Sequence, residues 1–191
     1  MKRSERFPAR AGFVGNLRLP LRAIYRIDEP DPSRPAEVLL KASLITNYRF
    51  PPGGRFDAEG LFLRGGRAMV VSKRFDGKDA EVFAIPLDPP APLLRPASPE
   101  RVARLPGCVE PATGADLSAD GRRLAVSTTS AARVYVPDGS GGWSLESTVR
   151  FAEPQVEAIC WDGDDLLLAS EDRSLYRISE RRWKAARGDG R

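Results

Sequence analysis

Acidic side chains recur at spaced positions along this 191-residue chain, each among small residues and shortly before a turn. Glu59, Asp116 and Glu157 mark three such places. Asp57 lies two residues before Glu59, and Glu171 directly follows Ser170 at the end of an apolar run. Carboxylate oxygens suit a hard cation such as Ca²⁺, which takes about six to eight oxygen ligands. The five acids are therefore the candidate ligand or metal-binding residues, with Ca²⁺ as the candidate cofactor.

Side chains that could support these acids also recur. They are Ser72, Lys73, Ser127, Thr128 and Ser170. If each serine bonds the acid of its own repeat, the pair braces the fold and explains the repetition without any ligand. If the acids instead converge, they hold a cation, and with Lys73 the same zone suits a phosphorylated or otherwise anionic ligand. Both interpretations, and a catalytic role for the zone, stay open at this point.

The composition excludes several kinds of catalytic site. The sequence has no histidine, which removes Ser-His-Asp and Cys-His nucleophile systems and His-ligated zinc. Cys108 and Cys160 are too few and too far apart for a disulfide framework or a thiolate metal site. Since no nucleophile and base pair is recognisable, no catalytic residue is named, and an enzyme is the less favoured outcome.

The charge pattern argues against a nucleic-acid partner, although the formal net charge is +4. The basic residues are scattered among acids, and clusters such as Arg181-Arg182 are too short to follow a phosphate backbone. The apolar runs fall far short of bilayer length, so we expect no membrane span. The basic N-terminal segment lacks the apolar core of an export signal.

Three segments of the chain resemble one another, over residues 57–87, 114–138 and 156–179. Each has an acid, a turn dipeptide that favours positive φ, an apolar strand ending in Ser, and a strand with an aromatic centre. The acids Glu59, Asp116 and Glu157 are 57 and 41 residues apart, close to the period of β-propeller blades. We therefore expect an all-β fold, a partial β-propeller with about three to four four-stranded antiparallel blades.

The repeat predicts a single domain over residues 1–191. Its parts are an incomplete blade at about 13–46 with strands at 21–27 and 36–45, and blades at about 56–105, 113–151 and 155–186. Residues 1–12 and 187–191 are predicted to be disordered, and 181–186 is the candidate fourth strand of the last blade. An arc that does not close exposes strand edges and an apolar flank, which favours self-association.

Two further patterns have structural interpretations. The run Asp162-Gly163-Asp164-Asp165 is similar to part of a calcium loop but lacks ligands at alternate positions, so we expect a hairpin turn. The aromatic residues Tyr25, Tyr135, Trp161 and Tyr176 recur at strand positions, and we expect them to pack between blades.

The chain resembles bacterial β-propeller proteins of poorly defined function over approximately residues 13–180. The resemblance rests on AIYRIDEP, FDAEGLF, TGADLSADGRRLAVST and VEAICWDGDDLLLASEDRSLYRI. Those proteins are exported, and the chain is more distantly similar to phytase-like and esterase-like propellers. The family would place further blades and a signal peptide before residue 13, so the resemblance implies an N-terminally truncated member. If the chain is such a truncated member, we expect the full protein to be exported. If it is not, we expect a cytoplasmic location.

Two functions follow. The first is a non-enzymatic scaffold that binds a ligand or a protein partner on its acid-lined face. The alternative is a metal (Ca²⁺)-dependent hydrolase of phosphate or carboxylate esters. The first is favoured because the chain has no recognisable nucleophile and base pair.

Overall fold

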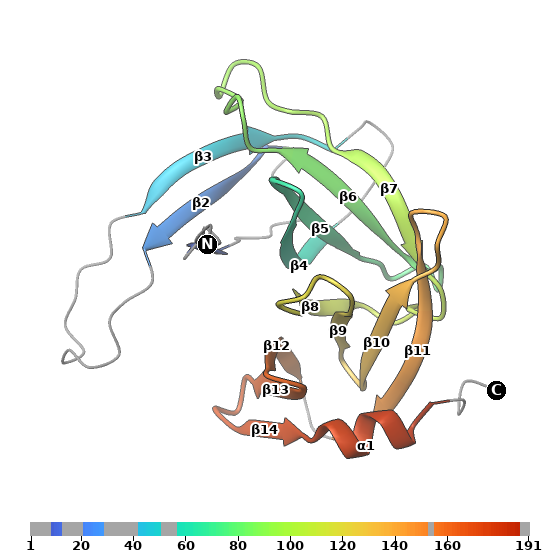
Figure 1. The fold of residues 1–191 in the computed structure, drawn as a ribbon. Helices are drawn as coiled ribbons and strands as arrows, with labels where there is room; N and C mark the ends of the chain where they lie inside the picture. The colour runs from blue at the N-terminus through green and yellow to red at the C-terminus, as the bar shows by residue number, and fades with distance from the viewer. Residues whose placement is uncertain (1–8, 13–20, 29–41, 51–56, 153–154, 188–191) are drawn as a thin grey trace, which may run out of the picture.

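The computed structural model describes residues 9–12, 21–28, 42–50, 57–152 and 155–187. Within these ranges the chain forms four antiparallel sheets and one helix, which follow one another in an arc (Figure 1). The first sheet contains β1 (Ala9–Gly12), β2 (Arg22–Asp28) and β3 (Ser43–Tyr48). The second contains β4 (Asp57–Arg64), β5 (Arg67–Lys73), β6 (Ala80–Pro86) and β7 (Glu100–Leu105).

The third sheet contains β8 (Ala112–Leu117), β9 (Leu124–Thr128), β10 (Ala131–Pro137) and β11 (Trp143–Arg150). The last contains β12 (Val156–Asp162), β13 (Asp165–Ser170) and β14 (Leu175–Ile178), which helix α1 (Glu180–Ala185) follows. In each of the last three sheets, neighbouring strands follow one another in the sequence. The prediction of an all-β fold built from antiparallel blades is confirmed.

Tight turns set the register of the inner hairpins. Gly65 and Gly66 both have positive φ and join β4 to β5. Asp162 pairs with Asp165 across Gly163, so this acidic run is a hairpin turn, as expected. Because glycine adopts positive φ without a Cβ clash, these dipeptides fix where each strand reverses.

The segment 181–186, a candidate strand in the sequence analysis, is instead mostly helix α1. Its residues favour a helix: Glu180 lies in the first turn and forms an ion pair with Lys184 one turn later. Trp183 is fully buried on this helix, with its ring centroid 5.8 Å from that of Trp161. The predicted strand is therefore wrong, and this segment is a helix that packs through Trp183.

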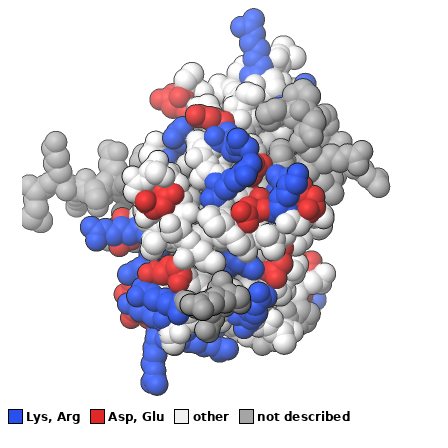
Figure 2. Space-filling view, turned by 90° about the vertical axis from the view of Figure 1, so that its right-hand side faces the viewer, with Lys and Arg blue, Asp and Glu red and all other residues white. Residues whose placement is uncertain are grey.

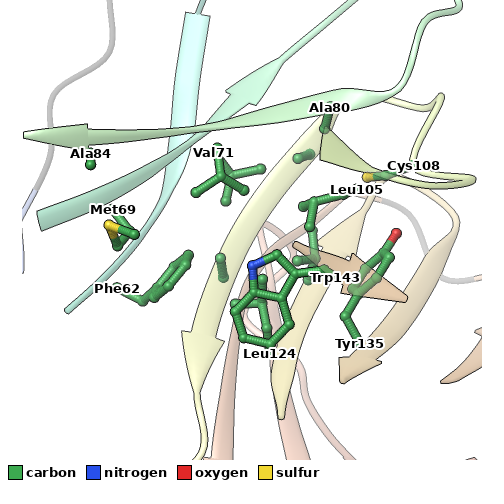
Figure 3. Close-up of a cluster of buried hydrophobic side chains, with 14 residues drawn as sticks. Phe62, Met69, Val71, Ala80, Ala84, Leu105, Cys108, Leu124, Tyr135 and Trp143 are labelled. Atoms are coloured by element: carbon green, nitrogen blue, oxygen red, sulfur yellow. The ribbon is translucent and has the colours of Figure 1, made fainter. Parts of the chain in front are cut away.

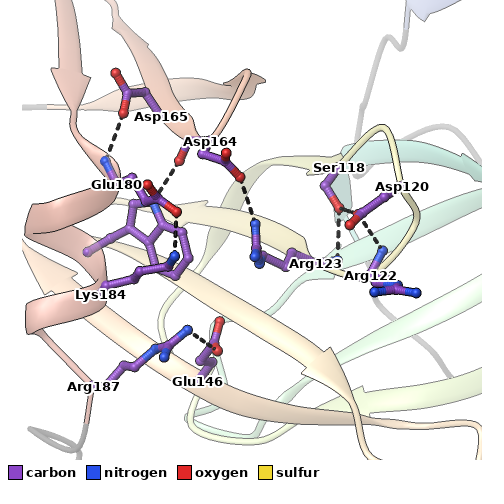
Figure 4. Close-up of polar contacts among 11 residues, drawn as sticks. Ser118, Asp120, Arg122, Arg123, Glu146, Asp164, Asp165, Glu180, Lys184 and Arg187 are labelled. Atoms are coloured by element: carbon purple, nitrogen blue, oxygen red, sulfur yellow. Dashed lines mark hydrogen bonds and ion pairs between the residues drawn. The ribbon is translucent and has the colours of Figure 1, made fainter.

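Polar contacts also hold the last sheet and α1 against the third sheet (Figure 4). Arg123 donates to Asp164 at 2.9 Å, and its guanidinium lies 5.5 Å from the centre of the Trp183 ring. Arg187, just after α1, forms an ion pair with Glu146 on β11. Each of these two contacts joins residues that are 41 positions apart in the sequence.

The first sheet differs from the sequence prediction at its edges. Strand β1, Ala9–Gly12, lies within the segment 1–12 that was predicted to be disordered, and it pairs with β2. The strand expected at 36–45 is found as β3 at Ser43–Tyr48, and residues 36–41 lie outside the described residues. Strand β2 covers the strand expected at 21–27.

Each pair of successive sheets encloses its own apolar core. Ile24 and Tyr48 of the first sheet pack against Ala58 and Val70 of the second. The largest core lies between the second and third sheets (Figure 3), and Trp183 belongs to the core between the third and last. The sheets therefore pack face to face in one direction along the chain, which places the first and last sheets at the two ends of the arc.

The helical content of the described residues is confined to α1. That helix is six residues long, and no described helix has the length and apolar character needed to cross a bilayer.

Candidate functional site

We call β4, β8 and β12, the first strands of the last three sheets, the inner strands. A β-bulge occurs at the same place in each of them and defines the register of the candidate site. In β4, Glu59 is the extra residue between two strand pairs, and Glu157 has the same place in β12. The equivalent residue of β8 is Thr113, which is followed by Gly114. Glu59 and Glu157 therefore lie at equivalent positions, as the sequence predicted, and bulges of this kind often redirect a side chain beside a functional site.

Asp116 does not belong to this set. The prediction that it matches Glu59 and Glu157 is wrong, because it lies three positions beyond Thr113, deeper in β8. Its Oδ2 accepts the backbone N–H of Trp161 at 2.9 Å, and its carbonyl accepts the Trp161 indole N–H at 3.2 Å. Asp116 is therefore a link between the inner strands of the third and last sheets.

The bulge acids lie near one ammonium group. Lys73 at the end of β5 donates to Glu59 Oε2 at 2.7 Å, and both side chains are largely buried. Burial raises the pKa of Glu157, and the negative charges of Glu59 and Glu171 raise it further, while the Lys73 ammonium opposes them. We call Glu59, Lys73, Glu157 and Glu171 the acid cluster. It comprises three carboxylates and one ammonium, of which Glu59 and Lys73 are in direct contact.

Asp57 points to a different neighbour. Its Oδ1 accepts the N–H of Ala58 at 3.0 Å and lies 3.9 Å from Nη2 of Arg22, a buried residue of the first sheet. Asp57 thus joins the second sheet to the first. Glu171 is exposed beyond the end of β13, and its N–H donates to the carbonyl of Gln155.

The supporting hydroxyl groups have partners other than the predicted acids. Ser72 accepts the N–H of Glu81 at 2.8 Å, and Ser127 shares a hydrogen bond of 3.0 Å with Thr113. Ser170 donates to Asp172. The predicted brace was a hydrogen bond between a serine and an acid of the same repeat. In the third sheet Ser127 instead bonds the hydroxyl of Thr113, the residue at the bulge position.

Thr128 belongs to a separate buried network, which the sequence analysis did not identify. Its hydroxyl donates to Glu110 Oε2 at 2.8 Å, and Arg133 donates to the same oxygen at 2.9 Å. Burial alone would raise the pKa of Glu110, but the hydrogen bonds from Thr128 and Arg133 lower it below its usual range. Arg133 is almost fully buried, so removing Glu110 would leave its guanidinium buried without this charge partner.

The described carboxylates do not form a cation site. Within the described part of the chain, no three acidic or cysteine side chains come together as a group that could hold a metal ion. Because Ca²⁺ needs several oxygen ligands at once, the acid cluster lacks the convergence that such a site requires. The Ca²⁺ assignment stays a prediction from the sequence.

A hollow of about 570 Å³ lies along the inner edges of β4, β8 and β12, and sequence reasoning missed it. Its lining includes Phe62, Asp116, Ser118 and Cys160. Each inner strand pairs with one neighbour only, so its other edge faces this hollow. The sequence carries no signal for it, because the space depends on how the sheets are arranged around the arc.

The outer surface shows mixed charge. On the face seen in Figure 2, basic and acidic side chains alternate over short distances rather than forming a broad area of one sign. Arg67 and Glu100 form one exposed ion pair of the protein surface.

Comparisons with known proteins find similarity among solved structures and none among protein families or curated sequences. No protein-family model matches the chain, and no curated protein sequence does either. Among solved structures, the C-terminal WD40 domain of Sif2 aligns with a TM-score of 0.48 and 11% identity, over 88% of this chain and 42% of that chain. A chain of the mitotic checkpoint complex aligns with a TM-score of 0.50 and 9% identity, over 93% of this chain and 50% of that one.

A third similar structure is that of the computationally designed Ika4 protein. It aligns with a TM-score of 0.46 and 12% identity, over 82% of this chain and 84% of that chain. This chain thus spans half or less of the two natural neighbours that it matches. At these identities the similarity concerns the fold alone, which is propeller-like.

Proposed function

We propose that this chain is a non-enzymatic, propeller-type binding module whose acid cluster binds a positively charged segment of a protein partner. The observation that carries the proposal is the environment of Glu157. Burial and the neighbouring carboxylates of Glu59 and Glu171 raise its pKa although Lys73 stands nearby. The cluster has three carboxylates and one ammonium, so its formal charge is negative, and a lysine or arginine from a partner would offset the repulsion between its carboxylates.

The position of the cluster supports the same proposal. Glu59 and Glu157 stand at equivalent bulges in the inner strands of two different sheets, so several sheets present polar groups at the same end. Propeller-like folds offer such ends as platforms. One of the structures to which this chain is similar belongs to the mitotic checkpoint complex, an assembly of proteins, which is consistent with a role in binding a partner.

The hydrolase alternative has less support. The acid cluster lacks a convergent set of metal ligands among the described residues, and the sequence has no histidine that could act as the base for a cysteine nucleophile. Burial raises the pKa of the Cys108 thiol to about 11, which disfavours the reactive thiolate. The narrower resemblance to exported bacterial propellers stays a prediction from the sequence.

The test is a calorimetric titration of the protein with an oligolysine peptide, and with oligoglutamate as the opposite charge. We expect oligolysine to bind and oligoglutamate not to bind. The double variant Glu157→Gln/Glu171→Gln should bind oligolysine about tenfold more weakly or worse, because it loses two negative charges. Glu100→Gln, an exposed acid on β7, is the matched control and should bind as the wild type does.

Two results would overturn the proposal. One is equal binding by the double variant and the control. The other is turnover of a chromogenic phosphate or acyl ester that requires Ca²⁺ and is lost in the double variant, since that would identify the hydrolase.

A further inference from the structure

Leu175 on β14 occupies a position that is buried in the two preceding sheets. It pairs with Ala169 on β13, which corresponds to the pairs Val82–Val71 and Ala132–Ser127. Val82 is 0% exposed and Ala132 is 1% exposed, because the next sheet covers each of them. Leu175 is 82% exposed.

The rest of this face follows the same pattern. Leu167 and Ala169 are half-buried on β13, and their counterparts in the second sheet, Met69 and Val71, lie in the core under the third sheet. We call this surface the open face of the last sheet, and it consists of Leu175, Leu167, Ala169 and Cys160. It has the register and the apolar side chains of a packing face, and no further sheet covers it among the described residues.

The first sheet has a matching open face at the other end of the arc. Tyr25 and Leu44 pair across β2 and β3 and are 42% and 53% exposed, whereas Ile24 on the opposite face is buried against the second sheet. In the later sheets the aromatic residues of the equivalent strands, such as Phe83 and Tyr135, pack toward the preceding sheet. Tyr25 and Leu44 form the open face of the first sheet.

We propose that the open face of the last sheet packs on the open face of the first sheet of a second copy, so that two copies close head to tail into one ring. Each copy contributes four sheets, and the contact repeats the packing that already joins successive sheets within the chain. Two copies make eight sheets, which lies within the range of about four to eight blades in propellers. Head-to-tail contacts form a closed ring when the rotation per copy completes a circle.

Opposite charges favour this pairing. Residues 156–178 of the last sheet contain six acidic and two basic residues. The described residues of the first sheet, 9–12, 21–28 and 42–50, contain four basic residues and one acidic residue. Two last sheets would repel one another, whereas a last and a first sheet attract, so the charges select head-to-tail contact over the symmetric alternative.

The inner strands provide a second argument. A Cβ atom on Gly60 would lie 2.9 Å from the Cβ of Ala115, and a Cβ on Gly114 would lie 3.2 Å from the Cα of Ala158. Glycine is needed at both places because the inner strand of the next sheet passes so close. The last sheet has Ala158 at this position, and it is exposed. An alanine fits there if the sheet that covers it has no inner strand. The first sheet meets this condition, because its described strands are β1, β2 and β3 and none of them is an inner strand.

The test is native mass spectrometry and light-scattering chromatography of the full chain, with one substitution on each open face. The wild type should have twice the 20.9 kDa mass of one chain. Leu175→Glu and Leu44→Glu should each give monomers, whereas Phe75→Glu, which alters an exposed residue between β5 and β6, should leave the dimer intact. An equal mixture of the two monomeric variants should recover a two-chain species, since one of its two contacts is unaltered.

The contrary outcomes are distinct. A monomeric wild type, or one that grows into longer assemblies, would overturn the closed ring. A dimer that Leu175→Glu breaks and Leu44→Glu leaves intact would show symmetric contact between last sheets and would also overturn it. Circular dichroism and thermal unfolding confirm that each variant is folded, and Tyr25→Glu repeats the test on the first sheet should Leu44→Glu fail to fold. The oligolysine titration does not depend on this result, so the two proposals fail separately.

Discussion

Gly114 and Ala158 lie on adjacent inner strands at a separation that leaves no room for a side chain on the glycine. A Cβ placed on Gly114 would stand 3.2 Å from the Ala158 Cα and 3.1 Å from the backbone nitrogen of Ile159. This contact joins the third and last sheets on the side of the arc where the hollow lies. The short distance between the inner strands, rather than any single side chain, sets the shape of this hollow.

The substitution Gly114→Ala should therefore lower the free energy of unfolding by about 1–3 kcal/mol, because backbone atoms must shift to admit the methyl group. The measurement is chemical denaturation followed by circular dichroism. Ala158→Gly is the control, since Ala158 is exposed and its methyl group can be lost for about 1 kcal/mol or less. Equal effects at both positions would contradict the close approach of the strands.

The Glu110 network predicts a loss of stability in acid. Despite burial, hydrogen bonds from Thr128 and Arg133 hold the pKa of Glu110 below the ordinary 4.5. The folded state therefore keeps the carboxylate charged where the unfolded state takes up a proton. Its stabilising effect is complete above pH 4.5 and is lost as the pH falls through the lowered pKa.

The variant Glu110→Gln should consequently be less stable than the wild type near neutral pH, by about 1–3 kcal/mol, because Arg133 loses its buried partner. The difference between the two proteins should shrink in acid. Thermal unfolding over a pH series gives both curves, and parallel curves would rule out the network as the cause.

Glu157 predicts the opposite trend. Burial and the charges of Glu59 and Glu171 raise its pKa, so the folded state holds a proton that the unfolded state has already lost. The contribution of Glu157 to stability therefore falls as the pH rises above 4.5 toward the raised pKa. Glu157→Gln should be at least as stable as the wild type near neutral pH. A clear drop in its melting temperature there would show that Glu157 is a structural brace.

The fold could be predicted from the sequence where the signal is local. Turn dipeptides and short apolar runs such as Leu166–Ala169 depend on neighbouring residues alone, and the strands they predicted are present. Helix α1 was not predicted because six residues are too few to show a helical period. Its formation depends on the burial of Trp183 against a distant sheet.

The candidate site was predicted only in part, because the repeats were aligned on their acids. The small residues Gly60, Gly114 and Ala158 hold the true register, since the inner strands come closest there. Aligned on them, Glu59 and Glu157 match Thr113, and Asp116 falls into the hollow. A register that depends on contacts between sheets leaves little trace in the spacing of charged residues.

The acid cluster makes one further prediction, because Lys73 is its single basic member. Replacing Lys73 with methionine removes the ammonium that donates to Glu59 at 2.7 Å and leaves the carboxylates in place. A positively charged peptide should then bind more tightly, by roughly fivefold, from about 1 kcal/mol for one charge at short range in water. Lys78→Met, an exposed lysine between β5 and β6, is the matched control.

The most direct test of the binding proposal is therefore the affinity of Lys73→Met for oligolysine, measured by calorimetric titration beside the wild type and Lys78→Met. A gain of binding is informative because damage to the fold would only weaken it. The proposal predicts tighter binding by Lys73→Met and wild-type affinity for Lys78→Met. An unchanged or weaker affinity for Lys73→Met would contradict the assignment of the acid cluster as the binding site.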